Sequence, residues 1–136
     1  ALVERVTPSP RLPPERRGRV GLEAYLDFVD ERAGAYGALM RSGIGNDPQV
    51  AAVLERTREA IVARLLEGLG LAEPRPVFRL AARSWIGQVE AACLEHLERR
   101  EVSRATLVEL LLGALRGTLL AARSLDPEAP LDLGGA

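Results

Sequence analysis

The stretch from Leu107 to Ala122 most constrains the fold of this chain, because its pattern is helical and it has almost no polar face. Only Glu109, Arg116 and Thr118 interrupt its apolar and small residues. A surface helix of a single domain needs one apolar stripe, about 100° wide. This helix has two apolar sides: Leu107, Leu111, Ala114, Leu115 and Thr118 on the first, and Leu112, Leu119 and Ala122 on the second. It must be buried twice, once by its own chain and once by a partner, and the simplest partner is a second copy of the chain.

Small residues recur in this stretch at a spacing of four, at Gly113, Gly117 and Ala121. Because these residues carry no large side chain, their spacing allows another helix to approach the backbone closely. A membrane span is the weaker interpretation, because the sixteen residues carry two charges and a span needs about 20 mostly apolar residues.

The composition indicates one globular domain. The chain has 136 residues, of which 47% are hydrophobic and 27% charged, enough for a real core. The net charge is −1, and the 18 basic residues, all Arg, are scattered, so no nucleic-acid-binding face is expected. The single cysteine, Cys93, excludes an internal disulfide, and with no visible signal peptide we expect a cytoplasmic protein.

The order of the patterns predicts an all-α bundle of about five helices. Residues 1–17 are expected to be a connector or the remnant of a preceding helix, residues 18–126 a single domain, and residues 127–136 a frayed tail. The helices are expected from Leu22 to about Gly34, around Tyr36 to Gly43, and over residues 47–68, 77–99 and 103–124. Asp47 and Ser103 are predicted helix caps. The turn at Glu101 and Val102 makes the last two helices antiparallel neighbours.

The sequence contains few residues of the types that usually act in catalysis. Cys93 and His96 lie three residues apart on one expected helix, as a thiolate–imidazole pair requires. No third orienting group is evident, and a buried free cysteine is usually a small hydrophobe. Two such residues are too few for a zinc site, and the Gly43–Gly45 stretch lacks the lysine of a phosphate loop. We expect no enzyme activity and no cofactor.

Two groups of residues remain as candidates for a binding site. Arg79, Arg83 and Glu90 lie on one side of the helix at 77–99 and form either an ordinary charged face or an orienting group for a ligand. The second group combines apolar rings with polar tips and either lines a small-molecule cavity or fills the core. Its members are Tyr25, Phe28, Tyr36, Met40, Phe78 and Trp85.

The run from Arg79 to Leu119 resembles the last two helices of the regulatory domain of TetR-type transcriptional repressors, and the segment from Ala24 to Val50 is similar to the preceding helices. The matching features, in order, are Tyr25-Leu26-Asp27-Phe28-Val29, Trp85-Ile86-Gly87 with Glu90, and the Leu-rich last helix. The resemblance implies a homodimer that forms a four-helix bundle through the helices near 77–99 and 103–124. It also implies a hydrophobic cavity for a small-molecule effector in each subunit. The predicted ligand-binding residues are Tyr25, Phe28, Tyr36, Met40, Phe78, Arg83, Trp85 and Val89.

Repressors of this type begin with a helix-turn-helix reader, and nothing before Leu22 has room for its three helices. The sequence therefore predicts the regulatory domain alone, with operator DNA contacted only through a reader absent from this chain. Ligand binding would release the DNA by changing the spacing of the readers. The alternative is a helical protein–protein interaction module with a solid core and no ligand.

Overall fold

The computed structural model describes residues 2–8, 11–12, 14–43, 47–71, 73 and 75–130, without the side chains at 14, 15 and 42. All regular structure within these residues is helical, which confirms the predicted all-α class. The elements are α1 (Leu2–Val6), α2 (Pro14–Glu31), α3 (Ala33–Ala38), the π-helical turn η1 (Leu39–Gly43), α4 (Pro48–Gly68), α5 (Pro76–Arg99) and α6 (Arg104–Leu125).

The predicted helix caps are confirmed. The Asp47 carboxylate accepts hydrogen bonds from the backbone N–H groups of Gln49 and Val50, and Pro48 occupies the first turn of α4. The Ser103 hydroxyl oxygen accepts a hydrogen bond from the N–H of Thr106 at the start of α6. These side chains satisfy amide groups that have no partner inside the helix.

The predicted bounds of the first long helix are wrong at both ends. It begins at Pro14, eight residues before the predicted start at Leu22, and it ends slightly before the predicted position. It stops at Glu31 rather than near Gly34, and a turn at Arg32 leads into α3. The Arg32 N–H bonds to the carbonyl of Val29, three residues back, so the last turn tightens and the chain bends there.

The antiparallel pairing of α5 and α6 is confirmed, and it forms the most extensive helix contact of the described structure. Residues 100–103 join the two helices, and Arg100 adopts the left-handed conformation with φ of 54°. The Trp85 indole N–H donates a 2.8 Å hydrogen bond to the carbonyl of Leu111 and so fixes the register of the pair. The buried residues of α5 are Phe78, Ala81, Ala82, Trp85, Ile86, Val89 and Cys93, and those of α6 are Leu107, Val108, Leu111, Leu115, Leu119 and Ala122.

The structure decides which side of α6 faces the core. Leu111 and Leu115 of the first predicted apolar side and Leu119 and Ala122 of the second all belong to one buried stripe, so the predicted division into these two sides is wrong. The row of small residues lies on the opposite, exposed side, where a Cβ added to Gly113 or Gly117 meets no atom within 4 Å. The side of α6 that its own chain leaves uncovered is therefore the small-residue side.

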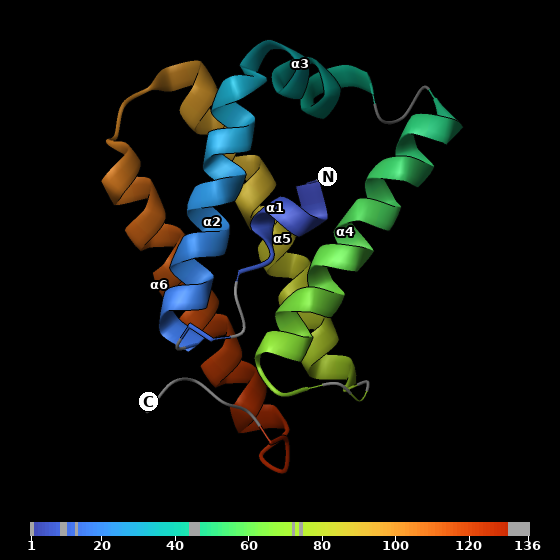
Figure 1. Ribbon diagram of the computed structural model, residues 1–136, viewed down its shortest axis with the longest axis vertical. Helices are drawn as coiled ribbons and strands as arrows, with labels where there is room; N and C mark the ends of the chain where they lie inside the picture. Colours follow the sequence, from blue (N-terminus) through green and yellow to red (C-terminus); the bar gives the residue numbers. More distant parts are fainter. Residues whose placement is uncertain are drawn as a thin grey trace.

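Helices α2 and α4 stand on either side of the short helix α1, with α5 behind them in Figure 1. Gly21 permits this placement of α1, because a Cβ at Gly21 would lie 2.8 Å from the carbonyl oxygen of Val6. A bidentate ion pair, with N–O distances of 2.7 and 2.6 Å, joins Arg5 of α1 to Glu31 at the end of α2. Helix α1 is thus held across the space between α2 and α4.

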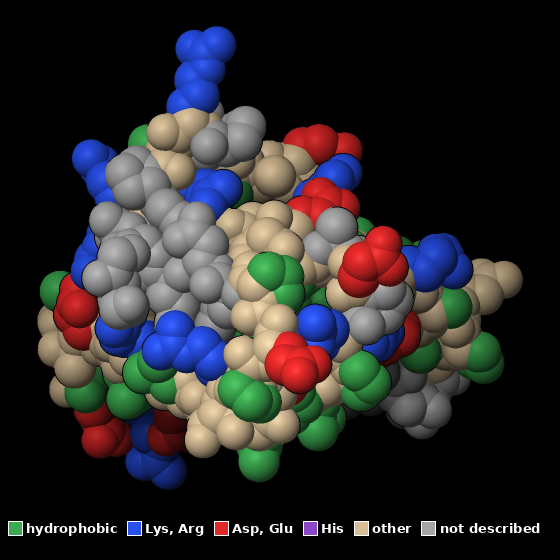
Figure 2. Space-filling model, turned by 90° about the horizontal axis from the view of Figure 1, so that it is seen from below, with side chains coloured by type: hydrophobic (Ala, Val, Ile, Leu, Met, Phe, Trp, Pro, Cys, Tyr) green, Lys and Arg blue, Asp and Glu red, His purple; other side chains and the backbone are tan. Residues whose placement is uncertain are grey.

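The surface carries charges of both signs. On the face seen in Figure 2, Arg side chains alternate with Asp and Glu side chains instead of gathering into one basic patch. By length and composition, α6 is apolar enough to cross a membrane, a test that the core helix of a helical domain also passes.

The described residues beyond α6 reach Pro130. Arg75 forms an ion pair with Asp126, and Ala129 is buried. The end of the predicted frayed tail, residues 131–136, lies outside the described residues, as do residues 9, 10 and 13 of the predicted connector. The domain boundaries at 17/18 and 126/127 stay predictions.

We predict that Phe78→Ala lowers the free energy of unfolding by about 3–5 kcal/mol, because Phe78 is fully buried and the truncation leaves a cavity. Urea unfolding followed by circular dichroism at one fixed protein concentration measures the loss. Val53→Ala is the control, because Val53 is 54% exposed and its loss should stay below about 1 kcal/mol. Equal losses for the two variants would contradict the placement of Phe78 in the core.

Candidate functional site

The main candidate site is a cavity of about 920 Å³ between α2, α4 and α5, with α1 across it and α3 and η1 at one end. This volume lies in the range that holds small organic ligands. Its apolar wall includes Leu22, Phe28, Met40, Leu54, Ile61, Leu65, Trp85, Ile86, Val89 and Leu115. Leu2 and Val6 of α1 complete that wall, so the short N-terminal helix is part of the site.

The cavity exists because α4 and α5 meet at one end and diverge toward the other. The short connection from Gly68 to Pro76 keeps the C-terminal end of α4 against the start of α5, where Val62 and Phe78 are fully buried. Farther from this connection the two helices separate, as Figure 1 shows. Trp85, Ile86 and Val89, two or more turns beyond the start of α5, then line the cavity.

Two tyrosines bring polar atoms to the cavity wall. The hydroxyl oxygens of Tyr25 on α2 and Tyr36 on α3 lie 2.8 Å apart in a hydrogen bond, and the rings meet edge to face. Burial raises the pKa of both phenols, so both stay neutral at physiological pH. The pair can offer hydrogen bonds to a ligand without bringing a charge.

An ion pair between Arg58 on α4 and Glu90 on α5 forms the second polar group of the wall. Arg58 donates from Nε and Nη2 to the two carboxylate oxygens of Glu90, both at 2.8 Å. The two side chains are only 14% and 13% exposed. A bidentate pair of this kind compensates both charges and ties α4 to α5 at the point where the helices diverge.

The structure brings six of the eight predicted ligand-binding residues together. Tyr25, Phe28, Tyr36, Met40, Trp85 and Val89 line the cavity, and Phe78 and Arg83 do not. Phe78 lies in the solid part of the core, where α4 closes on α5. Arg83 is paired with Glu55 near the surface, as Arg79 is with Glu59, so these two arginines form a charged face.

Glu90 pairs with Arg58, which is absent from the predicted site, and not with Arg79 or Arg83, with which it shares one side of α5 in the sequence pattern. The signal for Arg58 is its position: Leu54, Arg58, Ile61 and Leu65 share one face of α4, so the charge interrupts an apolar stripe. A charge in such a place needs a partner of opposite sign. Glu90, beside the buried Val89, supplies that partner.

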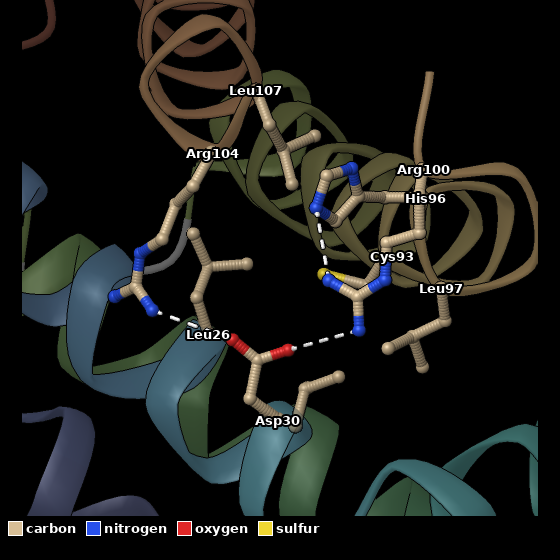
Figure 3. Close-up of a pocket in the computed structure, with 9 residues that line it drawn as sticks. Leu26, Asp30, Cys93, His96, Leu97, Arg100, Arg104 and Leu107 are labelled. Carbon is tan, nitrogen blue, oxygen red and sulfur yellow. Dashed lines mark hydrogen bonds and ion pairs between the residues drawn. The ribbon is translucent and has the colours of Figure 1, made fainter. Parts of the chain in front are cut away.

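A second, smaller pocket of about 40 Å³ contains both residues of the thiolate–imidazole hypothesis (Figure 3). Arg100 and Arg104 converge on Asp30 there, and the Nε2 atom of His96 lies 3.5 Å from Arg100. Burial raises the pKa of the Cys93 thiol to about 12, whereas a nucleophilic cysteine needs a lowered pKa. Among the described residues, no group of three or more His, Cys, Asp or Glu side chains is placed to hold a metal ion.

Comparison with known proteins places this arrangement in a family. The family model described as "Tetracyclin repressor-like, C-terminal domain" matches residues 14–116, which is more than half of the chain. The chain belongs to the TetR family of transcriptional regulators. The matched part includes α2 to α5 and α6 as far as Arg116, and does not include α1.

A solved structure agrees with the family assignment. The crystal structure of a TetR-family transcriptional regulator from Streptomyces coelicolor is similar, with a TM-score of 0.87 and 29% sequence identity. The similarity covers 93% of this chain and 58% of that one. The chain thus spans little more than half the length of this TetR-family relative. A search of the curated proteins finds no match.

We predict that Glu90→Gln destabilises the domain by about 1–3 kcal/mol, because it removes the bidentate partner of the nearly buried Arg58 guanidinium and leaves it only the longer contact of 3.5 Å with Glu55. Glu59→Gln is the matched control, because the ion pair between Glu59 and Arg79 is exposed and such a pair contributes less than about 1 kcal/mol. Urea unfolding of both variants at one protein concentration makes the comparison. A Glu90→Gln loss no larger than the control loss would mean that the wall of the cavity does not depend on this pair.

Proposed function

We propose that the chain is the effector-binding and dimerisation domain of a TetR-like transcriptional regulator, and that a small, mostly apolar ligand binding in it releases DNA. The observation that carries the proposal is the cavity of about 920 Å³ between α2, α4 and α5. An apolar wall with a few convergent polar groups is typical of small-molecule sites. The alternative, an interaction module with a solid core, fits a chain without such a space.

The proposed effector site consists of the six predicted residues that line the cavity, together with Arg58 and Glu90. The family is one of regulators and not of enzymes, and the high pKa of Cys93 agrees with a domain that binds and does not catalyse. We place the protein in the cytoplasm, where a regulator of transcription meets both its effector and DNA.

The proposed dimer contact is the outer face of α5 and α6. On α6 this face carries Leu110, which is 61% exposed, and the row Gly113, Gly117 and Ala121. On α5 it carries Leu80, which is 68% exposed, with small residues such as Gly87 and Ala91 farther along. Bare backbone flanked by exposed leucines is suited to close helix–helix packing, and two such helices from each of two copies make a four-helix bundle.

The proposed signal runs from the cavity to the N-terminal side of the chain through α1. Leu2 and Val6 line the cavity, so a ligand that fills this space contacts α1. Helix α1 rests on α2 through Gly21 and through the pair of Arg5 and Glu31. A ligand that binds more tightly when α1 is in one position than in another shifts the population of the domain toward that position. This shift changes the spacing of the DNA readers joined to the two subunits.

We predict that Ile61→Trp weakens the binding of an apolar ligand at least tenfold, because the indole would occupy the space that Ile61 now lines. The neutral fluorescent probe N-phenyl-1-naphthylamine, titrated into the purified protein, measures this binding. Val20→Trp is the control, since Val20 lies outside the cavity and adds the same indole. Absence of probe binding to the unmodified protein would refute the effector site, and equal binding to both variants would place the probe elsewhere.

We predict that Gly117→Leu raises the dissociation constant of the dimer at least tenfold, because the added side chain overpacks a close helix contact. The stability of the monomer should not fall, since leucine favours helix over glycine by about 0.5–1 kcal/mol. A Cβ at Gly117 also meets no atom of its own chain within 4 Å. Sedimentation equilibrium measures the constant. Ala52→Leu, at an exposed site of α4, is the control. An unchanged dissociation constant for Gly117→Leu would remove this face from the contact.

A further inference from the structure

We infer that the cavity selects an elongated, uncharged ligand whose single hydroxyl or carbonyl group bonds to the Tyr25–Tyr36 pair while a hydrocarbon chain fills the rest. This inference rests on the proposed function and specifies the chemical class of the effector. It follows from where the polar atoms of the cavity lie, which of their hydrogen bonds are already made, and which charges are already compensated.

The polar groups of the wall fall into two sets. Those of Thr7, Asp47, Gln49, Arg64 and Glu67 belong to exposed residues at the rim. The inner set is small, and consists of Arg17, Tyr25, Tyr36, Thr57, Arg58 and Glu90. A ligand that leaves water for the interior is therefore oriented by the inner set.

The charges of Arg58 and Glu90 in the inner set are already balanced. Glu90 accepts two hydrogen bonds from Arg58, and Arg58 also lies 3.5 Å from Glu55. The Thr57 hydroxyl donates to the carbonyl of Val53 in its own helix. A carboxylate placed here would meet the negative charge of Glu90 and no uncompensated cation, and burial of such an ion is costly.

The two tyrosines still have hydrogen-bonding capacity for an uncharged group. In the hydrogen bond of 2.8 Å one hydroxyl donates to the other, which uses one of the two O–H donors. Each hydroxyl oxygen also keeps acceptor capacity. Because burial keeps both phenols protonated, the pair can donate to a carbonyl oxygen or exchange hydrogen bonds with an alcohol.

The space next to the pair is elongated and apolar. Along α2 the wall runs from Phe28 and Tyr25 through Leu22 to Gly18 and Arg17, a rise of about 16 Å at 1.5 Å per residue. The opposite wall, from Leu54 through Ile61 to Leu65, follows the same direction on α4. This shape suits an extended hydrocarbon chain.

Arg17 provides the competing possibility. It lines the far end of the cavity, about eight residues or 12 Å from Tyr25 along α2, and donates to the carbonyl of Gly68. Among the described residues no ion pair of Arg17 with a carboxylate is found. An anionic head group at Arg17 would reverse the ligand and overturn the inference, so the test includes this arginine.

The experiment compares decan-1-ol with decanoate, which have the same chain length and differ in the charge of the head group. Trp85 lines the cavity and is the only tryptophan of the chain, so its fluorescence reports occupancy directly. We expect decan-1-ol to bind at least tenfold more tightly than decanoate at pH 8. In the Tyr25→Phe/Tyr36→Phe double variant we expect the affinity for decan-1-ol to fall about three- to tenfold, the effect of one lost hydrogen bond. Arg16→Gln, at an exposed position of α2 outside the cavity, is the control and should leave the binding of decan-1-ol unchanged. Arg17→Gln tests the competing possibility and is titrated with decanoate.

The other outcomes test the ligand class, the role of the tyrosines and the proposed function separately. Decanoate binding as tightly as decan-1-ol, with a loss in Arg17→Gln, would overturn the inferred ligand class and leave the effector site intact. A preference for the alcohol that survives in the double tyrosine variant would overturn the role of the tyrosines. No response of Trp85 to either compound or to N-phenyl-1-naphthylamine would refute the proposed function itself.

Discussion

The packing of α5 against α6 is the interaction on which the rest of this structure depends. Trp85 holds the pair in register through its hydrogen bond to the carbonyl of Leu111, and the same indole forms part of the cavity wall. Because α6 buries only one stripe against its own chain, its other side remains free for a second copy. One helix pair thus provides the core, one wall of the site and the proposed dimer face.

The cavity follows from a constraint on α4. A short connection joins the end of α4 to the start of α5, and the two helices diverge with distance from this connection. The pair of Arg58 and Glu90 bridges the gap with charged groups instead of closing it with apolar ones. Helix α1, held by Arg5 and Glu31, then covers the space between α2 and α4. A ligand in that space contacts α1, α2, α4 and α5 at once.

The sequence predicts the helices well because their signals are local. Asp47 and Ser103 act within three residues of the helix starts that they cap, and the buried stripes of α5 and α6 repeat over several turns. It predicts the site less well because a cavity depends on how helices diverge. Phe78 and Trp85 are two turns apart on one face of α5 and look alike in the sequence, yet one lies in solid core and the other in the cavity wall. Likewise, no local pattern distinguishes Glu90, which pairs inside the wall, from the surface pairs of Arg79 and Arg83.

Hydrogen–deuterium exchange of the protein with and without bound decan-1-ol measures whether occupancy of the cavity is transmitted to α1, as the proposed signal requires. The account predicts slower exchange in α1 and in the residues of α2 and α4 that line the cavity, with little change at the end of α6 near Leu125. Saturating ligand that leaves exchange in α1 and α4 unaltered would contradict it.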